Sequence, residues 1–290
     1  YVLTAPQSDR CDMGSTLEYV WELPYARVTF AVSAASDKGL IRRVNEDSYL
    51  AVPPLFIVAD GMGGHAFGDR ASQETARVLD SLLPGERPST AGRVLEAVAR
   101  ANAAVQAISA DEFAGTTLTG IALVQDSAGD SCNWMAFNVG DSRVYSWDGS
   151  SLHQVSVDHS AVQELVDEGL ITAAEAADHP DRNVITRAIG IDGDMQPDVW
   201  LLPAEGTHSF LICSDGLTKE LDDPSIAVVL RTDASGQSHA DRLVAAALAS
   251  GGADNVTVVV VESTVTLSKS SSNTQSGSLP AHLEVTHPRS

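Results

Sequence analysis

Apolar residues in this chain form short runs and alternating segments, a pattern that predicts many short β-strands. The runs 55–59 and 256–261 are continuous, as is typical of strands buried on both faces. Segment 27–33 alternates between polar and apolar residues, as a strand does when one face is buried. Further strands are predicted at 49–52, 116–124, 132–139, 152–157, 199–202 and 209–213, with a hairpin turn at 125–131.

Apolar residues at helical spacing predict four helices that come in two pairs. The first pair spans 66–83 and 91–109, with Pro84-Gly85 as the stop signal between them. The second pair spans 224–230 and 238–250, and strict alternation of strands and helices is absent. Adjacent strands and paired helices favour a layered α+β fold, in which sheets bury one face on each other and the other face under helices.

Residues 158–195 differ from the strands around them. They are polar, contain short helical stretches at 161–168 and 173–177, and break at His179-Pro180. We therefore expect an inserted subdomain there.

The two ends of the chain fall outside this pattern. Residues 1–25 are weakly patterned and stay unassigned, although Trp21, Leu23 and Tyr25 are suited to packing on a domain edge. Residues 263–290 are rich in Ser and Thr, and such a composition buries too little apolar surface to fold. We expect this segment to be a disordered linker or tail.

Composition narrows the range of functions. The chain has 290 residues, 43% of them hydrophobic, enough for a sizeable core. Its formal net charge of -21 comes from 39 acidic and 18 basic residues and argues against non-specific binding to nucleic acid or an anionic membrane. An acidic chain suits a protein that collects divalent cations, although solubility alone also explains the charge.

Cysteine spacing and hydropathy indicate the compartment. Cys11, Cys132 and Cys213 lie far apart without a CxxC pair, which supports neither a disulfide framework nor a zinc site. We therefore expect a reducing, cytoplasmic location. No apolar run approaches the roughly 20 residues of a membrane helix, and residues 1–25 carry no signal-peptide pattern.

Asp60 is the first residue along the chain whose position suggests a functional role. It ends the buried run 55–59, and three of the next four residues are glycines, which we expect to turn the chain. A carboxylate at the tip of a buried strand, beside a backbone that a ligand can approach, suits a hard cation or a phosphate. The alternative is a tight strand-to-helix turn with a solvated aspartate.

Similar arrangements recur downstream. Asp215 comes after the strand 209–213, separated from it by Ser214, and is followed by glycine. Asp254 stands between a pair of glycines, 251–252, and the strand 256–261. Asp141 lies in a Gly-Asp-Ser turn between two predicted strands, where ordinary hairpin chemistry explains it equally well.

In this order, the segments resemble the metal-dependent serine/threonine protein phosphatases of the PP2C (PPM) family, in particular its compact bacterial branch. The matching motifs keep the family's order over residues 26–262. They are RRVNED (42–47), VADGMGG (58–64), GTT (115–117), VGDSRV (139–144), DHS (158–160), NVITRAIG (183–190), SDGL (214–217) and DN (254–255). The resemblance covers neither residues 1–25 nor the tail.

The resemblance implies a four-layer αββα sandwich of two antiparallel β-sheets flanked by helix pairs, with the metals at one end. Residues 26–262 would form the phosphatase domain and 158–195 its flap. The implied activity is hydrolysis of phosphoserine and phosphothreonine in proteins by a water or hydroxide that bridges two metals. Implied partners are phosphorylated proteins, among them Ser/Thr kinases and their substrates, and we expect a monomer.

Two other functions stay open. One is a narrower switch phosphatase that acts on a single regulatory partner. The other is a catalytically weak or inactive PP2C-like module that serves as an interaction domain. Modules of that kind usually lose a metal aspartate or the phosphate arginine, whereas this chain keeps Asp60, Asp215, Asp254 and Arg42.

The resemblance also implies a ligand set for two metal ions. Asp60 would bridge them and the carbonyl of Gly61 would bind one, while Asp215 and Asp254 would bind the other. Carboxylates gathered so closely repel each other unless a cation lies among them. Oxygen ligands with retained waters favour Mg²⁺ or Mn²⁺ over zinc, and two such ions can raise the hydroxide character of a bridging water.

Four further residues receive roles from the resemblance. Glu46 and Asp47 would act at the metals directly or through water, and Asp141 would share a third, weaker ion with Asp215. Arg42 would bind the substrate phosphate, a task that suits a planar, permanently charged guanidinium.

The general acid is left open. Animal-type members carry a histidine after the Asp-Gly pair, whereas this chain has Met62, as is usual in the bacterial branch. His65 and His159 are candidates, each equally well explained by a surface or packing role, and a metal-bound water is a third candidate.

Overall fold

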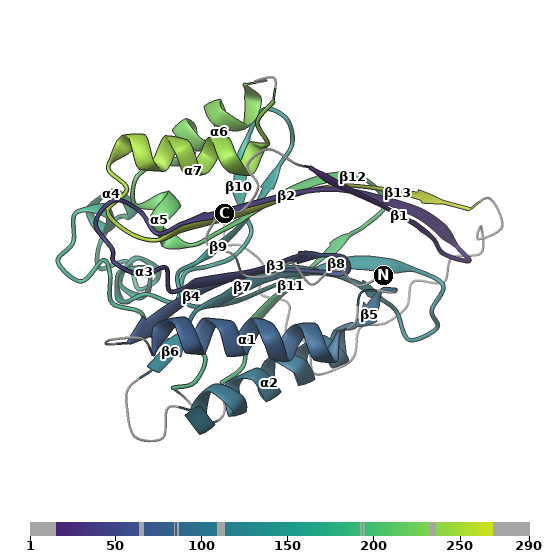
Figure 1. Ribbon diagram of the computed structural model, residues 1–290, viewed down its shortest axis with the longest axis horizontal. Coiled ribbons are helices and arrows are strands. Elements are labelled where there is room, and N and C mark those ends of the chain that lie inside the picture. The colour runs from purple at the N-terminus through teal and green to yellow at the C-terminus, as the bar shows by residue number, and fades with distance from the viewer. Residues whose placement is uncertain are drawn as a thin grey trace.

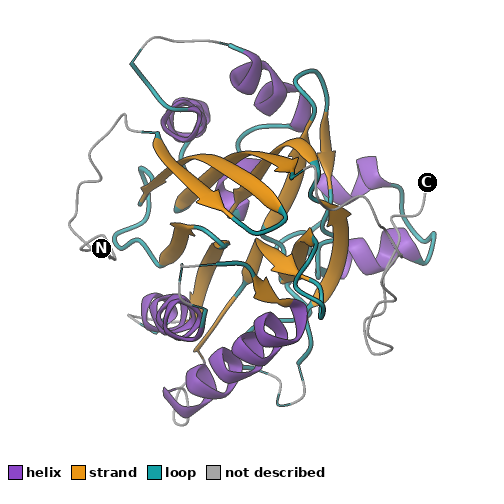
Figure 2. Cartoon of the chain, turned by 90° about the vertical axis from the view of Figure 1, so that its right-hand side faces the viewer, coloured by secondary structure: helices purple, strands orange, loops and turns teal. Residues whose placement is uncertain are grey.

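Two β-sheets form the centre of the molecule. The computed structural model describes residues 16–268 except 64–66, 84, 86, 109–113, 192, 194 and 233–235. The sheets lie face to face, one above the other in Figure 1, and we call them the upper and the lower sheet. Helices lie on the outer side of each sheet (Figure 2). The fold is therefore the αββα sandwich expected from the sequence.

Strand order differs from sequence order in both sheets. The upper sheet has the order β1 (Leu17–Glu22), β2 (Ala26–Asp37), β13 (Val256–Leu267), β12 (Gly206–Cys213), β9 (Arg143–Trp147), β10 (Leu152–Gln154). The lower sheet has the order β11 (Asp198–Pro203), β8 (Cys132–Val139), β7 (Leu118–Gln125), β4 (Leu55–Gly63), β3 (Asp47–Val52), with β5 (Ser89–Thr90) beside β7 and β6 (Ala114–Thr116) beside β4. Neighbouring strands are antiparallel apart from the short β5, which is parallel to β7.

The central strands are buried on both faces because each sheet is covered twice. On β4, Phe56 and Val58 point between the sheets, whereas Leu55 and Ile57 point toward the helices of the lower sheet. This two-sided burial explains why such strands appear in the sequence as continuous apolar runs. Between the sheets the rings of Phe30, Phe56, Trp134 and Phe210 pack with centroid separations of 5.3–6.2 Å.

The predicted helix pairs are confirmed. The helices α1 (Gly68–Leu82) and α2 (Ala91–Ile108) lie on the lower sheet, and α6 (Asp223–Arg231) and α7 (His239–Ser250) lie on the upper sheet, as Figure 1 shows. The short helix α5 (Asp215–Thr218) follows β12 directly. No helix in the described part of the chain is long and apolar enough to cross a membrane.

The subdomain predicted at 158–195 contains two short helices, α3 (Ala161–Asp167) and α4 (Ala173–Ala177). It projects from one end of the sandwich. Each helix begins at a hydroxyl cap, Ser160 for α3 and Thr172 for α4. From 161 to 187 none of the side chains whose burial is described is fully buried, so few apolar contacts hold this subdomain in place.

The upper sheet extends beyond the domain limits expected from the sequence. β1 lies within residues 1–25 and pairs along its whole length with β2, and Tyr19, Trp21 and Leu23 pack against the core between the sheets. At the other end β13 continues to Leu267, so residues 263–267 belong to a strand and not to the predicted tail. Residues 1–15 and 269–290 lie outside the described part of the chain.

Two expectations about turns are wrong. The Gly-Asp-Ser segment 140–142 does not close a hairpin, because β8 belongs to the lower sheet and β9 to the upper sheet. The glycines after Asp60 do not turn the chain at once, because β4 continues through Gly63 and pairs there with β6. The strand predicted at 152–157 is also shorter, since β10 ends at Gln154.

Candidate metal centre

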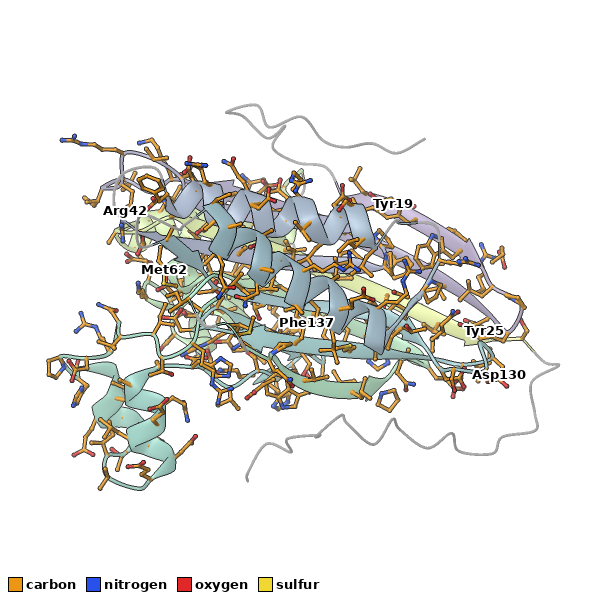
Figure 3. The ribbon with its side chains drawn as sticks, turned by 90° about the horizontal axis from the view of Figure 1, so that it is seen from below. Tyr19, Tyr25, Arg42, Met62, Asp130 and Phe137 are labelled. Carbon is orange, nitrogen blue, oxygen red and sulfur yellow. The ribbon has the colours of Figure 1, made fainter. Side chains whose placement is uncertain are left out.

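The candidate metal centre lies at one end of the sandwich, where strands of both sheets end. In the lower sheet, Asp60 on β4 and Asp47 on β3 stand directly opposite each other in register. In the upper sheet, Asp215 follows β12 and Asp254 precedes β13. Figure 3 shows Arg42 and Met62 at this same end, from which α3 and α4 also project.

Threonine and serine hydroxyls fix the backbone around Asp60. The Asp60 N–H donates to Thr117 Oγ1 at 2.9 Å, and the Asp60 carbonyl accepts from the Thr117 N–H at 2.8 Å and from Thr116 Oγ1 at 2.9 Å. Thr117 Oγ1 also shares a hydrogen bond of 2.8 Å with Ser142 Oγ, next to Asp141. These hydroxyls lie in recognised motifs but received no role from the sequence, and together they connect the Asp60 and Asp141 segments.

Two glycines allow the close backbone contacts of the centre. A Cβ on Gly61 would lie 2.1 Å from the carbonyl oxygen of Gly68, and a Cβ on Gly216 would lie 1.9 Å from the carbonyl oxygen of Asn255. Either contact is impossible for a larger residue without a shift of the backbone. Each glycine therefore brings the segment beside an aspartate against a neighbouring segment, and this explains its place after Asp60 or Asp215.

Several carboxylate oxygens in the centre have unused lone pairs. Asp47 Oδ2 accepts from Ser214 Oγ at 2.8 Å, and Ser214 Oγ accepts from the Thr257 N–H at 2.9 Å. Within the described residues, the second oxygen of Asp47 and one oxygen each of Asp141 and Asp215 are buried without a hydrogen-bond partner. Buried polar atoms are rarely left so, because burial without a partner is costly. Oxygen atoms of this kind suit the coordination of a hard cation.

The charges of these aspartates act on one another. Burial, followed by the charges of Asp47, Asp215, Asp141 and Asp254, raises the pKa of Asp60 well above its ordinary value. Burial also raises the pKa of Asp47 and of Asp141 to about 7, with the charge of Asp215 adding to both shifts. Such shifts arise where carboxylates share a buried site, and a bound cation would reverse them.

Asn255 holds the loop 38–46 beside the centre. Its amide donates to the carbonyls of Lys38 and Val44, both at 2.9 Å, and its side-chain oxygen accepts from the Glu46 N–H at 2.9 Å. The Glu46 carboxyl is partly buried, and burial raises its pKa. Asn255 thus positions a loop that carries two of the predicted site residues, Arg42 and Glu46.

Arg42 makes a bidentate ion pair with Asp254. Its Nε lies 2.8 Å from Oδ1 and its Nη2 lies 2.9 Å from Oδ2. Burial is the largest single influence on the pKa of Arg42 and lowers it, but the charge and hydrogen bond of Asp254, together with the charges of Asp60 and Glu46, outweigh burial and raise the pKa. The Arg42 side chain is half exposed, so the guanidinium lies at the rim of the centre where it can meet an incoming anion.

Lys219 is a residue of the centre that the sequence reasoning missed. Its ammonium group contacts Asp215 Oδ2 and lies 3.3 Å from Asp254 Oδ2. The signal was its spacing, since a lysine four residues after an aspartate on a helix forms an ion pair with it. Arg42 and Lys219 thus both contact Asp254, and Lys219 also contacts Asp215. Within the described chain no three acidic, His or Cys side chains are gathered tightly enough to enclose a metal ion.

The histidines proposed as acids have different outcomes. His159 is buried, its Nδ1 accepts from the Gly140 N–H at 3.1 Å, and its Nε2 lies 3.3 Å from Asp198 Oδ2. Nδ1 therefore holds the start of the 158–195 segment against the turn 140–142, and Nε2 holds it against Asp198 at the start of β11. With both ring nitrogens engaged, the packing role is favoured. His65 lies outside the described residues.

Comparison with known proteins gives the site its context. The family model described as Protein phosphatase 2C matches residues 43–250. The serine/threonine protein phosphatase PstP of Mycobacterium tuberculosis is 40% identical over 244 residues, which cover 82% of this chain and 46% of that protein. The serine/threonine phosphatase stp of Listeria welshimeri is 34% identical over 243 residues, covering 78% of this chain and 93% of that protein.

The structural comparison also finds a serine/threonine protein phosphatase. The catalytic domain of PstP in complex with two manganese ions matches with a TM-score of 0.72 and 36% identity, covering 82% of this chain and 99% of that one. The chain spans about half the length of the Mycobacterium relative, since the match covers 46% of it.

Proposed function

The chain belongs to the protein phosphatase 2C family, and on that basis we propose that it hydrolyses phosphoserine and phosphothreonine monoesters in proteins with the help of two divalent metal ions. The observation that carries the proposal is the cluster around Asp60, in which carboxylates from both sheets are gathered; burial, followed by the charges of the neighbouring carboxylates, raises the pKa of Asp60. A site with so much unbalanced negative charge needs cations to act on a phosphate dianion.

The chemistry of the donors decides which metals fit. Carboxylate oxygens, three of them without hydrogen-bond partners among the described residues, suit Mg²⁺ or Mn²⁺. Asp60 and the Gly61 carbonyl would hold one ion, Asp215 and Asp254 the other, with Asp60 between them. When bound, the pair of ions supplies a nucleophilic water at neutral pH and stabilises charge on the phosphoryl group.

Residues of the chain perform the remaining tasks. Arg42 leaves Asp254 to bind two oxygens of the incoming phosphate, because a guanidinium fits phosphate and carboxylate in the same bidentate way. Asp47 and Glu46 would act at the metal ions, either directly or through water. Thr117 and Ser214 keep Asp60 and Asp47 in place throughout.

A third ion is part of the proposal. Asp141 is buried at the turn between the sheets, and the charge of Asp215 acts on it. A site of so few carboxylates binds Mg²⁺ weakly, since the ion gives up its waters reluctantly. We expect Asp141→Ala to keep the first two ions and the fold but to lose most of its activity. Calorimetric metal titration paired with assays decides this, and full activity of the variant would leave Asp141 as a turn residue only.

The substrates and partners follow from the same proposal. Phosphorylated proteins, among them Ser/Thr kinases and their substrates, would reach the centre beside the 158–195 flap, and the domain would act as a monomer. The flap has few buried anchors, so it opens at low free-energy cost and can adapt to a protein surface.

The direct test is hydrolysis of p-nitrophenyl phosphate and of a phosphothreonine peptide, with Mn²⁺, with Mg²⁺ and with a chelator. We expect turnover of both substrates with metal and none after chelation, and Asp254→Ala should serve as the inactive control. Turnover that survives chelation would refute the metal-dependent mechanism. A chain that is inactive with either metal would refute the proposed activity and favour an interaction module.

A further inference from the structure

Lys219 lies where two segments far apart in the sequence bring their carboxylates together. It directly follows α5, so it stands one turn after Asp215, while Asp254 comes from the loop before β13. Its Nζ contacts Oδ2 of Asp215 and lies 3.3 Å from Oδ2 of Asp254. One ammonium group therefore holds the two side chains that the proposed function assigns to the second metal ion.

This arrangement differs from an ordinary surface ion pair. The Lys219 side chain is 36% exposed, and those of Asp215 and Asp254 are 13% and 19% exposed. Opposite charges interact more strongly when water is partly excluded than they do on an open surface. Asp141 also lies close enough for the charge of Lys219 to act on it. The lysine therefore contacts both aspartates that would bind the second ion, and its charge also acts on Asp141.

An ammonium group and a divalent cation cannot occupy the same carboxylate oxygens. Arg42 engages both oxygens of Asp254, and Lys219 shares Oδ2 with it. The two cations have different geometry, however, because Arg42 is half exposed and bound to one aspartate, whereas Lys219 spans two. Of these two side chains, Lys219 is the one placed to compete for the pair of ligands.

We propose that Lys219 is a built-in competitor of the metal ion held by Asp215 and Asp254, so that this ion binds more weakly and is more easily lost than the ion on Asp60 and Gly61. The inference rests on the metal assignment of the proposed function. A metal ion that must displace a resident group binds with an apparent affinity reduced by the fraction of molecules in which the ligands are free. Saturation of the centre then depends on the free metal concentration.

The test is a calorimetric titration of Mn²⁺ into chelator-stripped protein, without substrate. In Lys219→Met the weaker binding step should become about tenfold tighter, because the competitor is lost while the ligands remain. Lys219→Arg should bind Mn²⁺ as the wild type does, because it keeps a cation at the same place.

Lys38→Met is the matched control. Lys38 is exposed, and the substitution removes the same charge from the chain without touching Asp215 or Asp254. It should leave both binding steps unchanged, so a tightening equal to that of Lys219→Met would reduce the effect to net charge and overturn the proposal. Unchanged or weaker Mn²⁺ binding in Lys219→Met would overturn it as well. Lys219→Gln repeats the test with a polar side chain, and far-ultraviolet circular dichroism checks the fold of each variant.

The outcome is separable from that of the proposed function. The titration measures metal binding alone, so tighter binding in a chain without phosphatase activity would support the role of Lys219 and refute the phosphatase. Phosphatase activity together with an unchanged titration of Lys219→Met would support the proposed function and refute the role of Lys219.

Discussion

The interior of the sandwich and the end that carries the candidate metal centre, which we call the metal end, are built from the same strands. The two regions nevertheless have opposite chemistry. Phe56 and Val58 on β4 are fully buried among apolar side chains, and two residues further on Asp60 lies among other carboxylates. On β12, Phe210 and Ile212 join the core, and the chain then reaches Asp215. Each strand therefore runs from a stabilising environment into a destabilising one.

The comparison shows how the fold supports a costly site. Apolar burial is non-directional and contributes about 25 cal/mol for each Å² removed from water, so the interior needs only side chains of suitable size and pattern. The metal end instead depends on directional hydrogen bonds, such as Thr117 to the Asp60 backbone and Ser214 to Asp47. Substitutions in the interior should therefore lower stability, and substitutions at the metal end should lower activity.

The largest expected effect is that of Asp60→Ala. Turnover should vanish, because the proposed metal-bridging ligand is lost. The fold should survive, because the substitution removes a carboxylate whose burial and repulsion by its neighbours raise its pKa. Assays in Mn²⁺ and thermal unfolding of the chelator-treated protein measure the two properties. Near wild-type activity, or a clearly lower melting temperature, would break the distinction between the two regions; Asp254→Ala should behave in the same way.

Phe56→Ala should have the opposite profile. Phe56 is fully buried and its ring packs against Phe30 and Trp134, so the free energy of unfolding should fall by about 3–5 kcal/mol. Urea unfolding measures this loss. The activity of each folded molecule should change little, because the ring lies between the sheets and away from the carboxylates. A variant that keeps its stability but loses turnover would show that the interior and the metal end are coupled.

Arg42→Ala should sharpen the comparison at the rim of the centre. Loss of its charge-assisted hydrogen bonds to phosphate should cost roughly 1.5–3 kcal/mol of binding and raise KM, with stability unchanged because the side chain is half exposed. Arg42→Lys should recover only part of the loss, since a lysine cannot bind in the bidentate way. Steady-state kinetics separate KM from kcat. Unchanged kinetics in the alanine variant would move the phosphate role to another cation, with Arg43 the first to test.

The smallest expected effect is on the pH dependence of stability without metal. The pKa of Asp47 and of Asp141 is raised to about 7 in the folded chain, so between about pH 4 and pH 7 the folded state binds protons that the unfolded state has released. Stability of the chelator-treated protein should therefore fall as pH rises through this window, and Mn²⁺ should remove the fall. Melting temperatures at pH 5.5 and 7.5 test it, at roughly 2–4 °C for each kcal/mol. An equal change with and without Mn²⁺ would contradict it.

The sequence by itself determined most of the elements of this protein. The spacing of apolar residues predicts β4, β12, β13 and the helix pairs, because this spacing depends on the geometry of one strand or helix alone. The aspartates at strand tips were visible for the same reason. Their chemistry as a set, however, was inferred from the family resemblance.

Only the tertiary structure decided how these elements combine. The turn at Asp141 has the composition of a hairpin but connects the two sheets, and β1 lies in a weakly patterned segment because its edge position leaves Leu17 and Val20 exposed. Gly61 allows a close approach to Gly68, a neighbour that local sequence does not reveal. Lys219 is one turn from Asp215 in the sequence, but its contact with Asp254 exists only because β12 and β13 are neighbours in the upper sheet. Distances between segments far apart in the chain depend on which strands pair, and that pairing minimises the free energy of the whole sandwich and not of any one segment.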